Sequence, residues 1–261
     1  MARNNELGAA KTAKKDEFYT QLTDIEKEMR YYRKHFKGKT VLCNCDDPFE
    51  SNFFKYFVLN FNRLELKKQI ATCYATSPIM GSPLKYCMDA SGQMYISFDS
   101  ELTADNTTKR PYKAVVSVVY DKTGDGGVDM FDVAELFRSG ENQLTELSGD
   151  GDYRSDECLE LLQEADIVVT NPPFSKFREY VSTLIKYDKK FIIIGNINAA
   201  TYKETFPLIQ HNKMWLGASI HSGDRAFYVP DDYPLDAAGC GIDESTGRKF
   251  IRVKGVRWYT N

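Results

Sequence analysis

The fold is decided by one stretch of the sequence, ADIVVTNPPFSKFREYV (residues 165–181). Residues 166–170, Asp-Ile-Val-Val-Thr, have an apolar centre and are rich in β-branched side chains, which predicts a short buried strand. Asn171-Pro172-Pro173-Phe174 ends that strand, because two prolines remove two backbone donors and fix two φ angles. Apolar side chains then recur at i, i+3, i+4, i+7 and i+8, which predicts a helix over 175–187. The stretch therefore predicts a strand, a turn and a helix, the parts of a parallel-sheet unit.

A second unit of this kind precedes it in the sequence. Residues 40–45 form a short apolar run that predicts a strand, and Asp46-Asp47-Pro48 ends it. We expect Ser51 to cap a very apolar helix, and the run at 70–75 predicts the next strand. The order strand, helix, strand is that of a second parallel-sheet unit.

Residues 78–120 interrupt this alternation. Gln93–Phe98 and Tyr112–Tyr120 look extended and a polar loop joins them, so we expect an inserted hairpin. Before the first unit, apolar spacing over 23–36 predicts a helix with Thr23 as its N-cap.

The alternation resumes after the insertion. Helices are predicted over 132–138, over 155–164 and from Thr201, where Thr201 and Glu204 match a capping box. Strands are predicted just before Gly149 and over 190–195, and residues 214–261 predict short strands and loops without a strong helix. The whole pattern predicts an α/β fold with a mostly parallel, doubly wound sheet and one inserted hairpin.

Composition excludes several classes of protein. The chain has 261 residues and a net charge of −3, which excludes a generally basic nucleic-acid binder but not a local basic surface. No run reaches the ~18 apolar residues of a membrane helix, and the N-terminus lacks the apolar core of a secretion signal. Six cysteines without framework spacing and three scattered histidines predict reduced thiols and no metal. We expect a cytoplasmic protein without membrane association, and a monomer with no obligate protein partner.

Polar residues follow three of the predicted strands, at the end where open parallel sheets bind ligands. Asn171 supplies a side-chain oxygen beside the rigid proline turn, and Phe174 offers a ring that can stack on a flat ligand. The alternative is a turn that only stops the strand, with Phe174 in the core. Asp46 and Asp47 can bind a ligand or simply favour the N-terminus of the next helix. The Gly-Asp-Gly-Asp-Tyr run at 149–153 is a ligand loop or an ordinary turn.

One acidic segment resembles a calcium-binding loop. Residues 121–132 resemble a calcium-binding EF-hand loop in the spacing of their acids and glycine. The last position is Asp132 rather than Glu, and a predicted strand precedes it where an EF-hand needs a helix, so we expect a hairpin turn without calcium. The chain also lacks the G-x-x-x-x-G-K-[ST], G-x-G-x-x-G, H-E-x-x-H and G-x-S-x-G motifs. Nucleotide hydrolase, dinucleotide dehydrogenase, zinc protease and serine hydrolase functions therefore lose their support.

Together these motifs resemble those of S-adenosylmethionine-dependent amino-methyltransferases, and most closely those of the EcoRI-type adenine-specific DNA methyltransferase family. The resemblance covers most of residues 10–217 and rests on KKDEFYTQ (14–21), VLCNCDDPFESNFFKYF (41–57), LSGDGDYRSDE (147–157), ADIVVTNPPFSKFREYV (165–181) and DKKFIIIGNINAATYKETFPLI (188–209). It implies a Rossmann-like fold with 16–217 as the catalytic domain. It also implies methyl transfer to the exocyclic N6 of adenine in a specific DNA sequence, as in restriction-modification or phage modification.

The resemblance implies roles for particular residues. Asn171, Pro172, Pro173 and Phe174 match the catalytic motif, which accepts hydrogen bonds from the adenine amino group and stacks on the flipped base. The implied S-adenosyl-L-methionine site comprises Phe18, Tyr19, Thr20, Asn44, Asp46, Asp47, Asp152 and Asn171. The loop after the first strand departs from the family pattern, because Glu50 and Asn52 stand where glycines are expected. No acid ends the run at 70–75, so a ribose-binding carboxylate is not evident.

Double-stranded DNA with a flipped adenine is the partner that the resemblance implies. Candidates for phosphate contacts are Lys11, Lys14, Lys15, Lys176 and Arg178, although a solvated surface explains each equally well. Two alternatives stay open: an amino-methyltransferase acting on RNA or on a protein glutamine, and a catalytically degenerate nucleic-acid-binding relative. We expect 1–15 to be a mobile basic N-terminus and 218–261 to be a C-terminal β/loop region that holds a truncated part for target recognition.

The small net charge conceals an uneven distribution. Residues 121–166 contain fourteen acids and three bases, a net charge of −11, so the other 215 residues carry +8. A basic remainder beside an acidic segment is compatible with a polyanion bound at the catalytic face.

Overall fold

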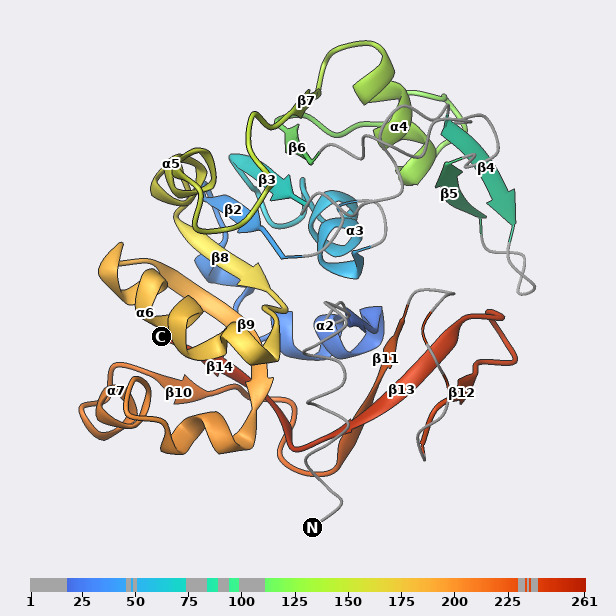
Figure 1. Ribbon diagram of the computed structural model, residues 1–261. Coiled ribbons are helices and arrows are strands. Elements are labelled where there is room, and N and C mark those ends of the chain that lie inside the picture. The colour runs from blue at the N-terminus through green and yellow to red at the C-terminus, as the bar shows by residue number, and fades with distance from the viewer. Residues whose placement is uncertain are drawn as a thin grey trace.

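The computed structural model describes residues 18–45, 48, 51–73, 111–229, 233, 235 and 239–261, and the backbone of 84–88 and 94–98. An eight-stranded sheet forms its centre and a four-stranded sheet lies beside it (Figure 1). In spatial order the strands of the large sheet are β10 (Trp215–Leu216), β14 (Val256–Thr260), β9 (Lys190–Asn196), β8 (Ile167–Thr170), β2 (Thr40–Cys43), β3 (Lys68–Thr72), β6 (Tyr112–Val116) and β7 (Gln143–Glu146).

Strand direction in the large sheet differs from the prediction. β3, β2, β8 and β9 are parallel, whereas β6 and β14 are each antiparallel to both of their neighbours. Four of the seven neighbouring pairs are thus antiparallel, and the prediction of a mostly parallel sheet is wrong. The apolar pattern of a buried strand is the same in either direction, so it could not reveal these two reversals. Six strands still run the same way, and the carboxyl ends of β2, β3, β7 and β8 share one edge.

Helices cover both faces of the large sheet, as expected for a doubly wound arrangement. On one face, Ile25 and Phe53 from two helices pack with Val41 of β2. On the other face, Tyr180 packs in a cluster with Leu42, the next residue of β2, because successive side chains of a strand point to opposite sides. The helices are α2 (Leu22–Met29), α3 (Asn52–Leu59), α4 (Met130–Arg138), α5 (Asp156–Glu164), α6 (Phe177–Lys186) and α7 (Phe206–Gln210), with 3₁₀ turns η1 (Arg33–His35), η3 (Phe174–Lys176) and η4 (Ile197–Thr201). Within the described ranges, no helix has the length and apolar character to cross a membrane.

The small sheet joins the two ends of the described chain. It is antiparallel throughout, with the order β1 (Tyr19–Thr20), β11 (Asp224–Tyr228), β13 (Lys249–Lys254) and β12 (Gly241–Ile242). Thr20 of β1 pairs with Phe227 of β11. β14, which follows β13, enters the large sheet instead and buries Trp258 completely. Residues 218–261 therefore contribute strands to both sheets.

The inserted segment contains a hairpin, but its strands differ from the predicted ones. β4 (Leu84–Met88) pairs antiparallel with β5 (Met94–Phe98), whereas the prediction pairs 93–98 with 112–120. Residues 112–116 instead form β6 between β3 and β7, with buried and half-buried side chains alternating along it. Such alternation fits a half-exposed strand in any sheet, so it cannot identify the partner strand.

The predicted helix starts are only partly correct. Ser51 caps α3 as predicted, since its hydroxyl accepts a hydrogen bond from the helix backbone at 3.2 Å. The prediction of a capping box at Thr201 and Glu204 is wrong, because Thr201 lies at the end of η4 and α7 begins later. The predicted cap at Thr23 is also wrong, because α2 already begins at Leu22.

The acidic segment 121–132 uses its carboxylates to hold its own backbone. Asp121 accepts hydrogen bonds from two glycine N–H groups at 2.6 and 2.8 Å. Asp132 accepts from three backbone N–H groups and forms the capping box of α4 with Asp129. The segment therefore starts a helix and is not the predicted hairpin turn. In the part of the chain that the structure describes, no three His, Cys, Asp or Glu side chains gather as a metal site requires.

Candidate functional site

Four segments with polar or glycine residues meet at the carboxyl edge of the large sheet. Asn44 follows β2, Cys73 follows β3, the loop 147–153 follows β7, and Asn171 follows β8. β6 runs the other way, so its start lies at the same edge, where the loop backbone donates to the Pro111 carbonyl at 2.9 Å. Open α/β sheets bind ligands at this edge. The structure thus brings together the three strand ends that the sequence marks as candidates.

Asn171 is held by the N-terminal segment. Its side chain is 5% exposed, and its Nδ2 donates to the Phe18 carbonyl at 2.6 Å. This bond fixes the orientation of the amide, because only the nitrogen can donate to a carbonyl. The other atom, Oδ1, is buried without a hydrogen-bond partner. A buried oxygen without a donor costs stability, so Asn171 presents an acceptor suited to an incoming N–H group.

The two prolines after Asn171 differ in what their carbonyls contact. The Pro173 carbonyl accepts the backbone N–H of Lys176 at 2.9 Å and so begins η3. Pro172 is a buried residue, and no backbone N–H of the described residues donates to its carbonyl. A second acceptor therefore lies one residue along the chain from Asn171 Oδ1.

Phe174 is positioned by two buried aromatic rings. Its ring centroid lies 6.1 Å from that of Phe18 and 6.4 Å from that of Phe227, with interplanar angles of 69° and 88°. Edge-to-face contacts of this kind restrict the orientation of a ring. Phe174 itself is only half-buried, so part of its ring stays accessible. Phe227 could not be selected from the sequence, because it belongs to no motif and lies far along the chain on β11.

The side-chain oxygen of Asn44, Oδ1, already has hydrogen-bond donors within the protein. It accepts a hydrogen bond from the Tyr180 hydroxyl of α6, and Cys45 Sγ lies 3.6 Å from it. Burial raises the pKa of Tyr180 well above its usual value, so this hydroxyl stays protonated and continues to donate. Tyr153 packs edge-on against Tyr180 with centroids 4.9 Å apart, and its own hydroxyl is buried without a partner. Of these two hydroxyl groups, only that of Tyr153 is therefore available to bind a ligand.

Asp152 is the centre of a group of ion pairs. Its carboxylate accepts from Arg154 Nε at 2.8 Å and Nη2 at 2.6 Å, and Lys176 Nζ lies 3.6 Å away. Hydrogen bonds from Arg154 are the main cause that lowers the pKa of Asp152 to about 2. Because Lys176 belongs to η3, this ion pair joins the loop 147–153 to the Asn171–Phe174 turn. The structure thus places a predicted cofactor residue and a predicted phosphate contact against each other.

Three threonines add buried hydroxyl groups to this edge. Thr20, Thr72 and Thr170 are at most 3% exposed, and the Oγ1 atom of each has no hydrogen-bond partner. Thr20 is among the predicted residues, and its neighbour Tyr19 lies under the Arg248 guanidinium at 5.7 Å. Thr72 and Thr170 were missed, although each ends an observed strand, and a threonine at the carboxyl end of an apolar run is the signal that could have identified them.

Several predicted residues lie outside the part of the chain that the structure describes. They are Asp46 and Asp47 of the expected cofactor site, and Lys11, Lys14 and Lys15 of the expected phosphate contacts. Their roles stay predictions.

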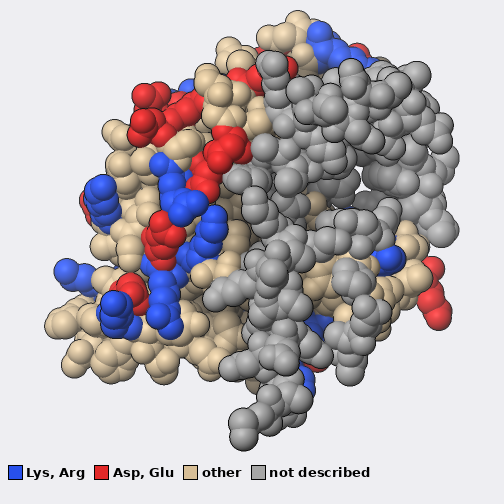
Figure 2. Space-filling view, in the orientation of Figure 1, with Lys and Arg blue, Asp and Glu red and all other residues tan. Residues whose placement is uncertain are grey.

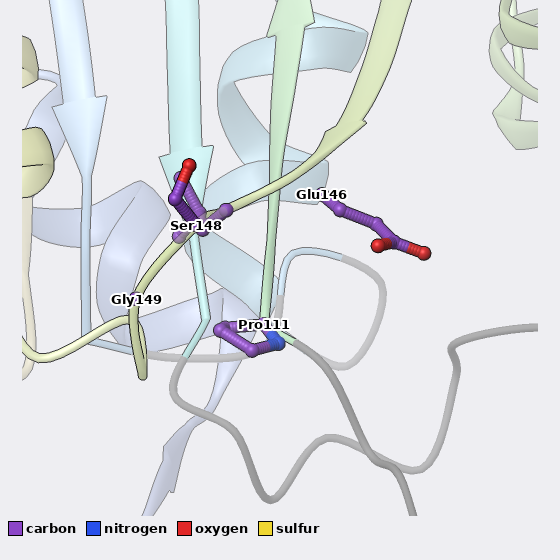
Figure 3. A pocket seen from close by; sticks show the side chains of 5 residues that line it. Pro111, Glu146, Ser148 and Gly149 are labelled. Atoms are coloured by element: carbon purple, nitrogen blue, oxygen red, sulfur yellow. The ribbon is translucent and has the colours of Figure 1, made fainter.

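A cavity of about 380 Å³ borders the loop after β7. Figure 3 shows Pro111 and Ser148 on neighbouring segments, with the Glu146 side chain directed away from them. Gly151 in the same loop lies so close to β3 that a Cβ would be 2.1 Å from the Cys73 carbonyl oxygen, and its φ is +75°. Only glycine fits this position without displacing the loop.

A second cavity, of about 330 Å³, borders the end of the Asn171–Phe174 turn. Phe174, Ser175, Arg178 and Tyr202 line it. The Arg178 guanidinium carbon lies 4.1 Å from the centre of the Tyr202 ring. Figure 2 shows acidic side chains gathered over α5, and basic side chains mixed with a few acidic ones over α6 below it. The cavity therefore borders the more basic part of this face.

Comparisons with known proteins identify the family of this chain. A family model described as the adenine-specific methyltransferase EcoRI matches residues 6–261. The chain is 45% identical to the Type II methyltransferase M.EcoRI of Escherichia coli, over 100% of this chain and 69% of the relative. It is 33% identical to the Type II methyltransferase M.MgeORF184P of Mycoplasma genitalium and 32% identical to M.MpnI of Mycoplasma pneumoniae, in both cases over 97% of this chain and 63% of the relative. No solved structure matches the chain significantly.

Proposed function

The chain belongs to the family of EcoRI-type adenine-specific methyltransferases, and on this basis we propose that it transfers a methyl group from S-adenosyl-L-methionine to N6 of adenine in a specific sequence of duplex DNA. The family predicted from the motifs is confirmed, and its description as adenine-specific supports the proposed reaction. The chain spans between 63% and 69% of the length of the three relatives. Their shared description as Type II methyltransferases supports DNA as the substrate.

One observation carries the proposal: the buried, unpaired Oδ1 of Asn171, whose amide is oriented by the Phe18 carbonyl. The amino group of adenine is a weak nucleophile, because its lone pair is delocalised into the ring. Two acceptors, Asn171 Oδ1 and the Pro172 carbonyl, can bind its two N–H groups and localise that lone pair on nitrogen. The turn is fixed before the substrate arrives, so the acceptors provide orientation and electrostatic stabilisation without reorganisation.

Phe174 supplies the surface for the target base. Its half-buried ring is held edge-on by Phe18 and Phe227, which leaves a face that can stack on adenine. Adenine N6 takes part in base pairing, so the base must leave the duplex before its amino group can contact Asn171. We therefore propose a flipped adenine between Phe174 and the acceptors.

The residues at the carboxyl edge suit the expected cofactor. When bound, S-adenosyl-L-methionine supplies a methyl group that its sulfonium already activates, so no covalent nucleophile of the protein is required. The unpaired hydroxyls of Thr20, Thr72, Thr170 and Tyr153 offer hydrogen bonds, and the cavity beside Gly149 has the size of a small-molecule site. We assign to this site the described residues Phe18, Tyr19, Thr20, Asn44, Asp152 and Asn171. The assignment also includes Asp46 and Asp47.

The test is chemical analysis of DNA from a host without adenine methylases that expresses the chain. We expect N6-methyladenine in digested DNA by mass spectrometry, confined to one sequence when modified bases are mapped. Methylation of RNA or of a protein glutamine instead of DNA would contradict the substrate. Cofactor binding without transfer to any of these substrates would indicate a degenerate relative.

The role of Asn171 is tested by Asn171→Ala. Loss of a preorganised transition-state contact costs about 10²- to 10³-fold in kcat, while cofactor binding by calorimetry should stay within about threefold. Asn62→Ala is the matched control. Asn62 also donates to a backbone carbonyl, that of Val119 at 2.8 Å, but it does not belong to the Asn171–Phe174 turn. Equal activities of the two variants would refute the assignment.

A further inference from the structure

Arg178 differs from the other basic residues around the Asn171–Phe174 turn. Arg154 contacts two carboxylates, those of Asp152 and Glu179, and Lys176 lies 3.6 Å from Asp152. Within the described ranges of the chain, the Arg178 guanidinium has no carboxylate within ion-pair distance and donates no hydrogen bond. Its charge is therefore available to an anion from outside the chain.

The guanidinium of Arg178 is nevertheless held in place. It lies over the Tyr202 ring with its central carbon 4.1 Å from the ring centre, and Tyr202 is itself packed against the core on the α5–α6 side of the sheet. Stacking uses the flat face of a guanidinium, whereas its N–H groups point outward in the plane. Arg178 therefore keeps its donors free while its side chain loses much of its conformational freedom, which lowers the entropic cost of binding.

The surroundings favour a phosphate group as the anion. Arg178 lines the 330 Å³ cavity together with Phe174, the residue proposed to stack on the target base. It also lies in the first turn of the ten-residue helix α6, whose N-cap residue makes no side-chain capping bond. The positive end of the helix dipole adds to the charge of Arg178. A guanidinium fork matches the oxygens of a phosphodiester.

From this geometry we propose that Arg178, positioned by Tyr202, binds a DNA phosphate directly beside the flipped adenine. The inference rests on the proposed function and adds a subsite to it. A phosphate fixed next to Phe174 holds the sugar–phosphate backbone in the flipped conformation and so keeps the base near Asn171. Tyr202 acts here as a positioning residue, because it contacts Arg178 and not the DNA.

The first test compares Arg178→Gln with Arg30→Gln on the target duplex that the mapping experiment defines. Arg30 is a matched control: it also lies over a tyrosine ring, at 4.8 Å, but it is the C-cap residue of α2, and its Nη2 donates to the Tyr31 hydroxyl at 2.7 Å. We expect Arg178→Gln to lower kcat/KM for DNA about tenfold and to reduce the slope of log(kcat/KM) against log[KCl] by about 1, as for one lost phosphate contact. Arg30→Gln should change neither value. An unchanged salt slope for Arg178→Gln would overturn the proposal.

The second test locates the contact on the DNA. Each phosphate that flanks the target adenine is replaced in turn by a neutral methylphosphonate. The unmodified protein should lose about tenfold in kcat/KM at one of these positions, and Arg178→Gln should lose nothing further there, because the two changes remove the same contact. Additive losses at every position would contradict the assignment.

Two substitutions of Tyr202 separate positioning from simple packing. Tyr202→Phe keeps the ring and should preserve both kcat/KM and the salt slope, whereas Tyr202→Leu should raise KM for DNA more than it lowers kcat. Equal effects of the two variants would refute the role of the ring. Failure of the proposed function has a different signature, because the unmodified protein itself would then methylate no DNA.

Discussion

Phe227→Leu is the substitution that best tests how the fold holds the Asn171–Phe174 turn. Phe227 is 1% exposed on β11, and its ring contacts both Phe18, at 6.1 Å, and Phe174, at 6.4 Å. Phe18 in turn orients Asn171 through its carbonyl. Leucine keeps an apolar side chain at this position but removes both ring contacts. The substitution therefore loosens the acceptor and the stacking ring together.

The expected size of the effect follows from these contacts. Phe227 packs edge-to-face against Phe174 and at an interplanar angle of 45° against Phe18. An aromatic pair contributes about 0.5–1.5 kcal/mol beyond burial, and the smaller side chain leaves part of its site unfilled. We expect the free energy of unfolding to fall by about 2 kcal/mol, which lowers Tm by about 4–8 °C in a chain of this size. A displacement on the order of 1 Å in a catalytic group costs up to 10²-fold in rate, so we expect kcat to fall at least about tenfold.

Phe57→Leu is the matched control, assayed beside Phe227→Leu for urea unfolding and for methyl transfer. Phe57 is fully buried and also has two aromatic ring contacts, with Phe36 at 5.1 Å and Tyr56 at 5.2 Å, but it lies on α3 and neither ring belongs to a proposed catalytic residue. Both variants should lose similar stability, and only Phe227→Leu should lose kcat at a temperature where both are folded. Equal kcat values at equal folded fraction would refute the reasoning.

Two further predictions concern stability and the cofactor loop. Glu28 is fully buried and accepts three hydrogen bonds, from the Tyr32 hydroxyl and from two backbone N–H groups of the C-terminal region, so Glu28→Gln should lower the free energy of unfolding by about 2 kcal/mol in urea titration. Exposed Glu26→Gln on the same helix should leave it unchanged. Gly151→Ala should weaken cofactor binding in calorimetry about tenfold, since the new Cβ collides with a backbone carbonyl at a positive φ. Gly127→Ala, which meets nothing within 4 Å, should bind normally, and a normal affinity for Gly151→Ala as well would show that the loop is not part of the site.

Local features of the fold could be predicted because their causes are local. The strand, proline turn and helix at 165–187 follow from side-chain period and from the conformational restriction of proline, and β8, η3 and α6 appear there. The Ser51 cap is likewise a contact between residues two apart. Where the cause was not local the prediction failed: the apolar run 112–116 forms a strand, but its partner and direction depend on the rest of the sheet.

In the candidate site, too, the residues of local motifs could be predicted and the contacts between distant residues could not. Asn171 and Phe174 could be selected from the turn and from the family resemblance, but the contacts that orient them come from distant parts of the chain. Phe18 is 153 positions from Asn171 along the chain, and Phe227 belongs to a different sheet. No spacing rule connects such residues. Arg178 could be named as a basic residue, but its stacking on Tyr202 distinguishes it from its neighbours only in three dimensions.

The distribution of unpaired polar atoms supports the site independently of any motif. Ten buried side-chain nitrogen or oxygen atoms among the described residues have no hydrogen-bond partner, and half of them lie at or beside the carboxyl edge of the large sheet, in Thr20, Thr72, Tyr153, Thr170 and Asn171. Each such atom costs about 1–3 kcal/mol. Elsewhere the same chain satisfies demanding groups, since the buried carboxylates of Glu28 and Asp132 each accept three hydrogen bonds. The fold thus satisfies two buried carboxylates with three hydrogen bonds each, yet five of its ten unpaired atoms lie together at one edge, where a polar ligand can pair them.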